Sequence, residues 1–436
     1  MGACVWVRAA VGAFVVLAAM ACSSDPGDGC VASACDITDG QCQKAIFAAT
    51  ACAREQNGTA MPKVRTISVD EYRKELTDGQ NAPTANDQTW TTALQLLGFL
   101  PAGKSIGDAS TDTSASDVAA FYDTDTKSVT VIDRGASDQQ QDLFILSHEF
   151  VHSLQDAKTG LDAFEQKWAH STDSDIAVHA LVEGEAVVLS SGVLSRSVGR
   201  DPHDTNWPAL ESSFFDSIFA SIDSAGAPFL TAVESLPYPV GSSGLLKPWL
   251  DSGQPGIDAF YAHPRQSLVD WTGDVTLGST SVEPIGCYPT AAPPDYGGVD
   301  HDTFGIAGAM IVFMGSGGNA RSAYDASSGW RNDSVVTFAP GDAADAGRAV
   351  AWRTHWDSPA SAAMFQAAAQ RALPAAVTAV DDADVTVRVA STPEVLMQWD
   401  GTACGAESDL PVAPPSATDT MTSVIGRARW RLVPSP

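Results

Sequence analysis

The sequence predicts an α+β fold in which a small sheet packs against long helices. Strand-forming runs lie between positions 63 and 133, two long stretches with helical spacing follow, and mostly helical spacing fills the remainder. The 436 residues, 44% of them hydrophobic, suffice for one large domain or two ordinary ones. We expect a mainly helical C-terminal part, residues 201–436, that either completes the domain begun by residues 43–200 or forms a second lobe.

The first residues have the composition of an export signal. A single basic residue, Arg8, precedes an apolar run, Ala9 to Met20, that is too short to span a bilayer comfortably. The sequence LAAMAC resembles a bacterial lipobox, whose cysteine receives a lipid, although Ala19 stands where Leu is usual. We therefore expect residues 1–21 to be an export signal and Cys22 to carry a lipid, the only membrane anchor, with simple secretion as the alternative. The expected location is a bacterial cell envelope, or otherwise the periplasm or the medium.

Six further cysteines predict disulfides, because their number is even and the chain is expected to be exported. They are Cys30, Cys35, Cys42, Cys52, Cys287 and Cys404. One possibility among the fifteen pairings is that the first four cysteines are bonded among themselves and that Cys287 is bonded to Cys404. Small and acidic residues predict a flexible tether over residues 22–42, with folding from about Gln43.

The charge is strongly acidic and spread over the whole chain. There are 53 acidic and 25 basic residues, which give a net charge of -28. Such a surface is typical of a well-solvated protein and makes nucleic acid an improbable partner. The Asp-rich runs lack the residue order of a calcium loop. Trp330, Trp352 and Trp356 are expected in the core.

The N-terminal elements follow from local patterns. A helix is predicted over residues 43–56, and a strand over 63–69 that runs into a helix capped by Ser68 with Glu71 three residues later. Two β-rich runs flank Asp123 to Lys127, which predicts a hairpin over residues 119–133.

The stretch LFILSHEFVHSLQD, residues 143–156, carries a metal-binding pattern in a helical run. On a helix His148 and His152 lie about 40° apart with Glu149 on the same side, while the leucines and Phe150 face the other way. Two imidazoles one turn apart can both bind zinc, and the adjacent glutamate can reach a water on it. The alternative is a surface helix with two unrelated histidines.

A catalytic zinc needs a third protein ligand. Gln155 and Lys158 stand where metzincins have Gly and His, so that class is excluded. A second apolar helix, with Asp173 or Ser174 as its cap, begins near residue 173 and continues to residue 194.

This second helix should be buried almost all round, with one narrow polar stripe made by His179, Glu183 and Ser190. A buried carboxylate must be paired or bind a metal. Glu183 is the preferred third ligand; the alternatives are that an arginine pairs with Glu183, or that Glu185, which points away, is the ligand. His179 either orients a ligand or packs.

Farther along the chain, spacing near 3.6 residues predicts helices over residues 207–222, 242–252, 256–263, 304–314 and 358–373. Only residues 384–391 have the alternation of a strand.

HEFVHSLQD followed by LVEGEA resembles the gluzincin clan of zinc metallopeptidases. More narrowly, the chain is similar to a family of poorly characterised bacterial and archaeal lipoproteins assigned as metallopeptidases, which share the hairpin AFYDTDTKSVTVI and the later segments GWRNDS and AWRTHWDSPASAAMFQAA. The likeness covers most of Lys63 to Leu373. It implies a zincin-like core within residues 43–200, Zn²⁺ held by His148, His152 and Glu183, and Glu149 as the general base.

The resemblance also implies an activity, cleavage of a peptide or protein substrate. Thirty residues separate His152 from Glu183, more than in the best-known gluzincins, so a loop over residues 157–175 is expected between the helices. Tyr238, His301 and His179 are candidates for the donor that stabilises the transition state. One strand of the hairpin is expected to bind substrate at its edge. The alternatives are a non-catalytic envelope lipoprotein that binds a partner, and a zinc hydrolase of a non-peptide amide.

Overall fold

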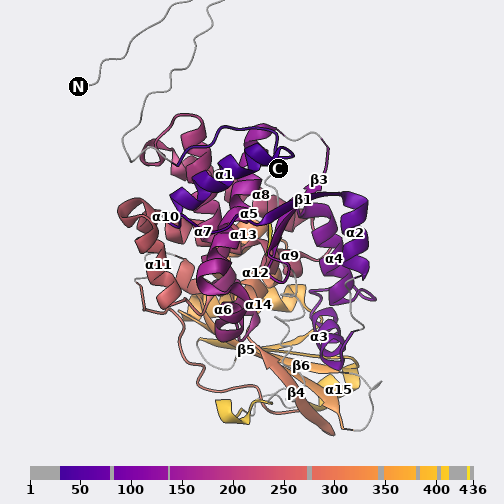
Figure 1. Ribbon diagram of the computed structural model, residues 1–436. Helices are drawn as coiled ribbons and strands as arrows, with labels where there is room; N and C mark the ends of the chain where they lie inside the picture. The colour runs from indigo at the N-terminus through magenta and orange to yellow at the C-terminus, as the bar shows by residue number, and fades with distance from the viewer. Residues whose placement is uncertain are drawn as a thin grey trace, which may run out of the picture.

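The fold is α+β, with two separate sheets and long helices between them (Figure 1). A computed structural model of the chain describes residues 30–78, 83–135, 138–272, 277–341, 348–379, 383–399, 404–411 and 430–432. The expected export signal and Cys22 lie outside the described residues.

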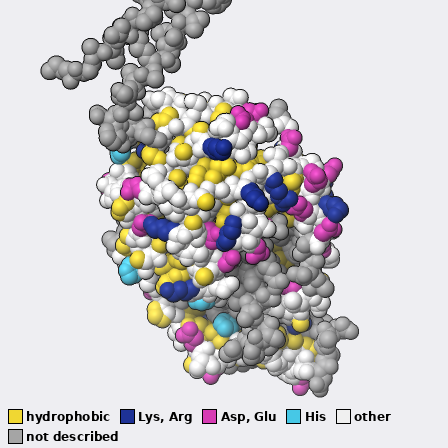
Figure 2. Space-filling model, in the orientation of Figure 1, with side chains coloured by type: hydrophobic (Ala, Val, Ile, Leu, Met, Phe, Trp, Pro, Cys, Tyr) yellow, Lys and Arg dark blue, Asp and Glu magenta, His cyan; other side chains and the backbone are white. Residues whose placement is uncertain are grey.

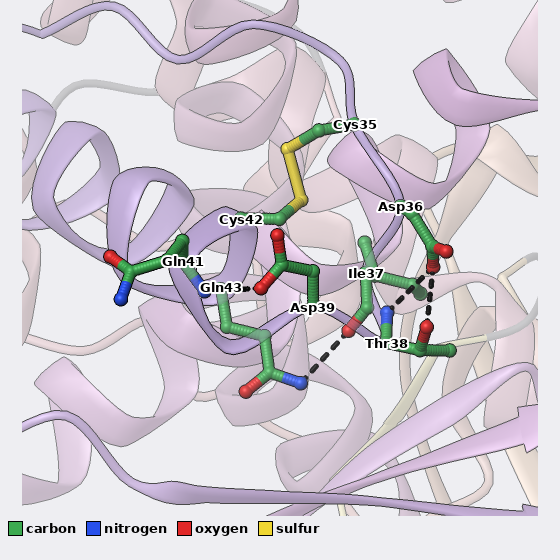
Figure 3. Close-up of a disulfide and its surroundings, with 8 residues drawn as sticks. All are labelled: Cys35, Asp36, Ile37, Thr38, Asp39, Gln41, Cys42 and Gln43. Carbon is green, nitrogen blue, oxygen red and sulfur yellow. Dashed lines mark hydrogen bonds between the residues drawn. A yellow bond between two sulfur atoms is a disulfide. The ribbon is translucent and has the colours of Figure 1, made fainter.

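Two disulfides fasten the N-terminal segment to the first helix, α1 (Gly40–Ala53). They join Cys30 to Cys52 and Cys35 to Cys42, and Figure 3 shows the second with the polar contacts around it. The side chain of Asp39 caps α1 by accepting the Gln41 N–H. The predicted bonding among the first four cysteines is confirmed, but the prediction of a tether as far as residue 42 is wrong from residue 30 onward, because the disulfides hold this part of the chain.

The first sheet contains the predicted hairpin. Its strands are β1 (Lys63–Ser68), β2 (Ala120–Asp123), β3 (Ser128–Asp133) and β9 (Trp430–Leu432), in the order β1-β3-β2-β9. β1 runs parallel to β3, and the other two pairs are antiparallel. Tyr122 and Val129 pack on one face of the sheet with Leu146 of α5 (Gln139–Thr159). Phe121 and Ile132 pack on the other face against Tyr72 of α2 (Val69–Asp78). The alternation of a strand thus buries both faces.

Helix α2 (Val69–Asp78) packs on this sheet, and α4 (Ile106–Asp117) packs on α2. Helix α3 (Ala85–Leu96) packs on α4 and on the second sheet. The predicted cap of α2 is confirmed, since Glu71 accepts the backbone N–H of Ser68 and Ser68 Oγ accepts that of Glu71. Neither α3 nor α4 was predicted from the sequence.

The two motif-bearing stretches form α5 (Gln139–Thr159) and α7 (Thr172–Ser197). Between them lies α6 (Leu161–Trp168), so most of the expected loop is helical. Ser171, rather than Asp173 or Ser174, caps α7: Asp173 Oδ1 instead accepts the Leu268 N–H. Of the described helices, α7 is the one long and apolar enough to cross a membrane, but 89% of its apolar window is buried, as in a core helix.

α7 crosses α10 at unusually short range. The helices that follow α7 are α8 (Trp207–Ser224), α9 (Pro228–Ser235), α10 (Pro237–Ser252) and α11 (Gln254–Ala262). A Cβ atom at Gly241 would lie 1.7 Å from the carbonyl oxygen of Ala180, and one at Gly184 would lie 2.3 Å from the Gly241 carbonyl carbon. Only glycines permit this approach of the two backbones.

The second sheet occupies the C-terminal part, at the bottom of the view in Figure 1. It is antiparallel, in the order β4-β5-β6-β8-β7, with β4 (Tyr296–Asp302), β5 (Trp330–Pro340), β6 (Ala349–Trp356), β7 (Ala376–Ala379) and β8 (Asp384–Ala390). Its helices are α12 (Gly305–Gly315), α13 (Ala320–Ala326), α14 (Pro359–Ala372) and α15 (Pro393–Gln398). Cys287 is bonded to Cys404, as in the predicted pairing.

The expectation that a single strand lies beyond residue 201 is therefore wrong. The six consecutive residues 333–338 of β5 and seven of the eight residues of β6 are buried, so these strands lack the alternation by which residues 384–391 were predicted. Trp330, Trp352 and Trp356 are buried, as predicted.

One hydrophobic core joins α7 to the second sheet, since a single cluster includes Trp90, Leu181 and Trp352. At the N-terminus of α7 the Thr172 backbone N–H and hydroxyl both donate to the carboxylate of Asp302, the last residue of β4. On the face shown in Figure 2, acidic side chains are interspersed with Lys and Arg.

Replacing Gly241 by Ala should force α7 and α10 apart. We expect the free energy of unfolding in urea to fall by about 1–3 kcal/mol or more. The matched control is Gly107→Ala in α4, where the new Cβ meets nothing closer than 3.9 Å, and a change within about 0.5 kcal/mol is expected. Equal stabilities of the two variants would contradict the close crossing.

Candidate metal centre

Three side chains from α5 and α7 meet at one point. His148 Nε2 lies 3.0 Å from Glu183 Oε2 and 3.0 Å from His152 Nε2, and His152 Nε2 lies 3.3 Å from the same carboxylate oxygen. The two histidines are one helical turn apart on α5, and α7 packs beside α5 to bring Glu183 to them. The side chains suggested by the sequence as a ligand set are thus adjacent.

This arrangement fits a metal ion. Atoms bound at about 2.1 Å to a tetrahedral metal lie about 3.4 Å from one another, close to the separations seen here. Two imidazole lone pairs and a carboxylate oxygen would repel one another at 3.0–3.3 Å unless a proton or a metal lay among them. His148, His152 and Glu183 therefore form a buried group that could hold a metal ion.

Burial makes the charge of each group depend on its neighbours. Burial lowers the pKa of His148 to about 4. Burial would also lower the pKa of His152, but the charges of Glu183 and Glu149 outweigh it and raise that pKa to about 9. For Glu183, burial would raise the pKa, yet the histidines lower it to about 2. At neutral pH the metal-free group thus holds a carboxylate and one extra proton, on His152.

Glu149 is fully buried next to the first histidine. Its negative charge raises the pKa values of His152 and of Tyr238, so the carboxylate lies near these two side chains. A carboxylate in this position can accept a proton from a group bound at the centre.

Tyr238 enters the site from α10 and is 3% exposed. Its ring stacks on that of His148, with centroids 6.0 Å apart, and its hydroxyl is hydrogen-bonded to Glu183. Burial and the charges of Glu183 and Glu149 raise its pKa well above the ordinary value, so the phenol keeps its proton. The close crossing at Gly241, three residues later, is what brings this hydroxyl to the centre.

The other two donor candidates have different surroundings. His179 lies one turn before Glu183 and pairs with Asp175 at 3.3 Å, in a group that includes Glu165. Although burial opposes it, the carboxylates raise the pKa of His179 to about 10, so a proton already balances this group. The suggestion of His301 is wrong: it lies in β4 of the second sheet, is exposed and donates to the Pro411 carbonyl.

The two glutamates of α7, Glu183 and Glu185, have different partners. Glu185 is fully buried and faces Arg54, whose Nε lies 2.9 Å from its Oε1. An arginine was considered above as an alternative partner of Glu183. Arg54 does pair with a buried acid of α7, but that acid is Glu185. The partners of the Glu183 carboxylate are the two histidines and the hydroxyl of Tyr238.

Gln155 is the contact residue that the sequence reasoning overlooked. Its Oε1 accepts a hydrogen bond from His152 Nδ1 at 2.8 Å. The available signal was its position three residues after His152, on the same side of the helix.

Metal binding should displace the proton on His152. Both imidazoles must be unprotonated to bind a metal, and the pKa of His152 is raised to about 9. We expect release of about one proton per metal ion at neutral pH, and an affinity that rises about tenfold per pH unit until His152 loses its proton. Titration calorimetry in buffers of different ionisation enthalpy measures this; binding without proton release would contradict it.

Comparison with known proteins identifies one partial match. Residues 293–404 match the model of a family described as a domain of unknown function (DUF8575). This segment contains β4 to β8 with their helices and lies outside the histidine and glutamate cluster. No curated protein matches the chain, and no solved structure matches it.

Proposed function

We propose that the protein is a zinc-dependent peptidase with a zincin-like core made of the first sheet, α5 and α7. The observation that carries the proposal is the meeting of His148, His152 and Glu183, with Glu149 beside them. Two imidazoles and one carboxylate, with a position left for water, are the donor set of a catalytic zinc. The same donors could bind other transition metals, so zinc is part of the proposal.

Zinc, when bound, would acidify a water molecule and polarise the scissile carbonyl. Glu149 would take the proton of the attacking water and pass it to the leaving amine. The protonated hydroxyl of Tyr238 would donate a hydrogen bond to the oxygen of the carbonyl as it becomes negative. Tyr238 is thus the preferred donor among the three candidates, because it alone contacts a proposed ligand from the facing helix.

A peptide substrate would have to reach an edge of the first sheet. Both strands of the hairpin lie inside the sheet, β3 between β1 and β2, and β2 between β3 and β9. β9 is three residues long and pairs with β2 over Ala120 to Tyr122. A substrate bound along β2 would therefore replace β9.

The second candidate function is a non-catalytic envelope protein that uses this fold to bind a partner. The specific observation in its favour is closure: His148, Glu149 and His152 have no exposed surface, and β9 covers the edge of β2. In this case the metal would stabilise the fold without turnover.

Export is part of either proposal. Three disulfides fit an oxidising environment outside the cytoplasm. A lipid on Cys22 would then hold the protein at the cell envelope, with a peptide, a protein or a binding partner as its target and no role for nucleic acid.

Metal content and turnover of residues 23–436 test the proposal together. We expect one zinc per chain by mass spectrometry, lost in Glu183→Ala. Glu149→Gln should keep the zinc and lower the cleavage of unfolded protein by about a hundredfold or more, because it removes the base.

Three results would contradict the proposed zinc-dependent peptidase. A zinc-free parent after reconstitution would remove the metal centre, and wild-type cleavage by Glu149→Gln would remove the mechanism. Zinc in the parent without turnover of any peptide library would favour the binding protein.

Arg431→Pro should expose the edge of β2. Proline cannot donate to a strand ladder, and Arg431 is paired with Phe121 at the centre of this short strand. If peptides bind along β2, the variant should have a higher kcat/KM for an unfolded substrate at unchanged zinc content. A kcat/KM equal to that of the parent would place the substrate elsewhere.

A further inference from the structure

The imidazole of His152 is hydrogen-bonded to the side-chain amide of Gln155 on the side away from the candidate metal position. Its Nδ1 lies 2.8 Å from Gln155 Oε1, and both side chains are fully buried. A histidine with a proton on Nδ1 offers the lone pair of Nε2, and Nε2 is the atom that faces Glu183 and His148. The orientation of the amide therefore decides which ring nitrogen can bind a metal.

The orientation of the Gln155 amide is fixed by two acceptors. Its Nε2 donates to the Val182 carbonyl at 2.8 Å and to Glu185 Oε2 at 2.9 Å. If the amide were flipped, its oxygen would face these two acceptors, and no proton would lie between them. The oxygen of the amide must therefore face His152, which requires the proton to lie on Nδ1.

Glu185 is itself held in place by donors from two other helices. Arg54 Nε donates to Oε1 at 2.9 Å, Gln254 Nε2 donates to Oε1 at 2.7 Å, and the Tyr261 hydroxyl donates to Oε2 at 2.6 Å. Glu185 is 0% and Arg54 1% exposed. A buried carboxylate with a paired arginine and several donors is a rigid acceptor.

We propose that Arg54, Glu185 and Gln155 form a positioning chain that keeps the proton of His152 on Nδ1 and directs the lone pair of Nε2 toward the metal centre. The inference rests on the proposed zinc site. It gives the two glutamates of EGE separate roles, because Glu183 faces the metal position and Glu185 anchors the amide behind His152.

The chain also connects the centre to the N-terminal segment. Arg54 directly follows α1, and Cys52 of that helix is bonded to Cys30. Docking of α1 against α5, where Phe47 meets Phe150, therefore supplies the cation that balances Glu185. The disulfide-bonded segment is in this sense part of the support of His152.

Gln155→Met tests the proposal, because it keeps an unbranched side chain of similar length and removes the amide. We expect zinc affinity, measured by competition with a chromophoric chelator, to fall by about 10–100-fold. The Nδ1 proton of His152, observed by ¹H–¹⁵N NMR in both the metal-free and the zinc-loaded protein, should be lost or exchange rapidly in the variant. This second readout would not change if Gln155 only filled space.

Gln254→Met is the matched control. It removes one donor from Glu185 but leaves both contacts of the Gln155 amide nitrogen, so zinc affinity should stay within about threefold of the parent. If Gln155→Met does not fold, as judged by circular dichroism, Glu185→Gln takes its place: it keeps the volume, removes the charge, and should weaken zinc binding by more than about threefold with faster exchange of the Nδ1 proton.

Parental zinc affinity with an unchanged Nδ1 signal in Gln155→Met would overturn the proposal, as would a parent without a slowly exchanging Nδ1 proton on His152. A parent that binds no zinc but shows a Gln155-dependent Nδ1 proton would support the positioning chain while the proposed zinc function fails.

Discussion

Two buried carboxylates on one helix are the constraint on which the rest of the structure depends. Glu183 and Glu185 are two residues apart on α7, which is buried on nearly every side, so they point in different directions and neither can be solvated. Glu185 is compensated by Arg54, from a helix that disulfides hold in place. Among the described residues, Glu183 is bonded to the imidazoles of His148 and His152 and to the hydroxyl of Tyr238, and one proton or one metal ion must compensate its charge. Glu185 has a permanently charged partner in Arg54, whereas Glu183 has none among the residues bonded to it. This difference is the strongest physical argument for a metal centre here.

The scaffold places the remaining groups through close packing. α5 is held between the first sheet and α7, so its two histidines cannot turn toward water. The crossing of α7 with α10 at Gly184 and Gly241 brings Tyr238 to within stacking distance of His148. The second sheet holds the far end of α7 through Asp302. Elements that are distant in the sequence thus act on one helix, and its position determines the geometry of the site.

The same burial that orders the centre also closes it. A hydrolase needs a path for substrate, and the edge of β2 that a peptide would follow is paired with β9. The segment matched by the family model contains the second sheet and none of the three residues of the candidate metal centre. A peptide could pair with this side of β2 only if β9 were displaced.

The sequence by itself determined the local geometry. The spacing of His148 and His152 places them one turn apart on any helix, and the polar stripe on the next apolar helix singled out Glu183 over Glu185, because backbone hydrogen bonds set both patterns within a few residues. It also predicted the hairpin, the cap of α2 and the paired cysteines. Strands β5 and β6 could not be predicted, because burial on both faces removes their alternation. Only the tertiary structure decided that Arg54 neutralises Glu185, that Gln155 supports His152 and that Tyr238, not His301, reaches the centre. The contacts of Arg54 and Tyr238 join residues far apart in the chain, which no local pattern encodes. The contact of Gln155 depends on the orientation of its amide, which Val182 and Glu185 of α7 fix.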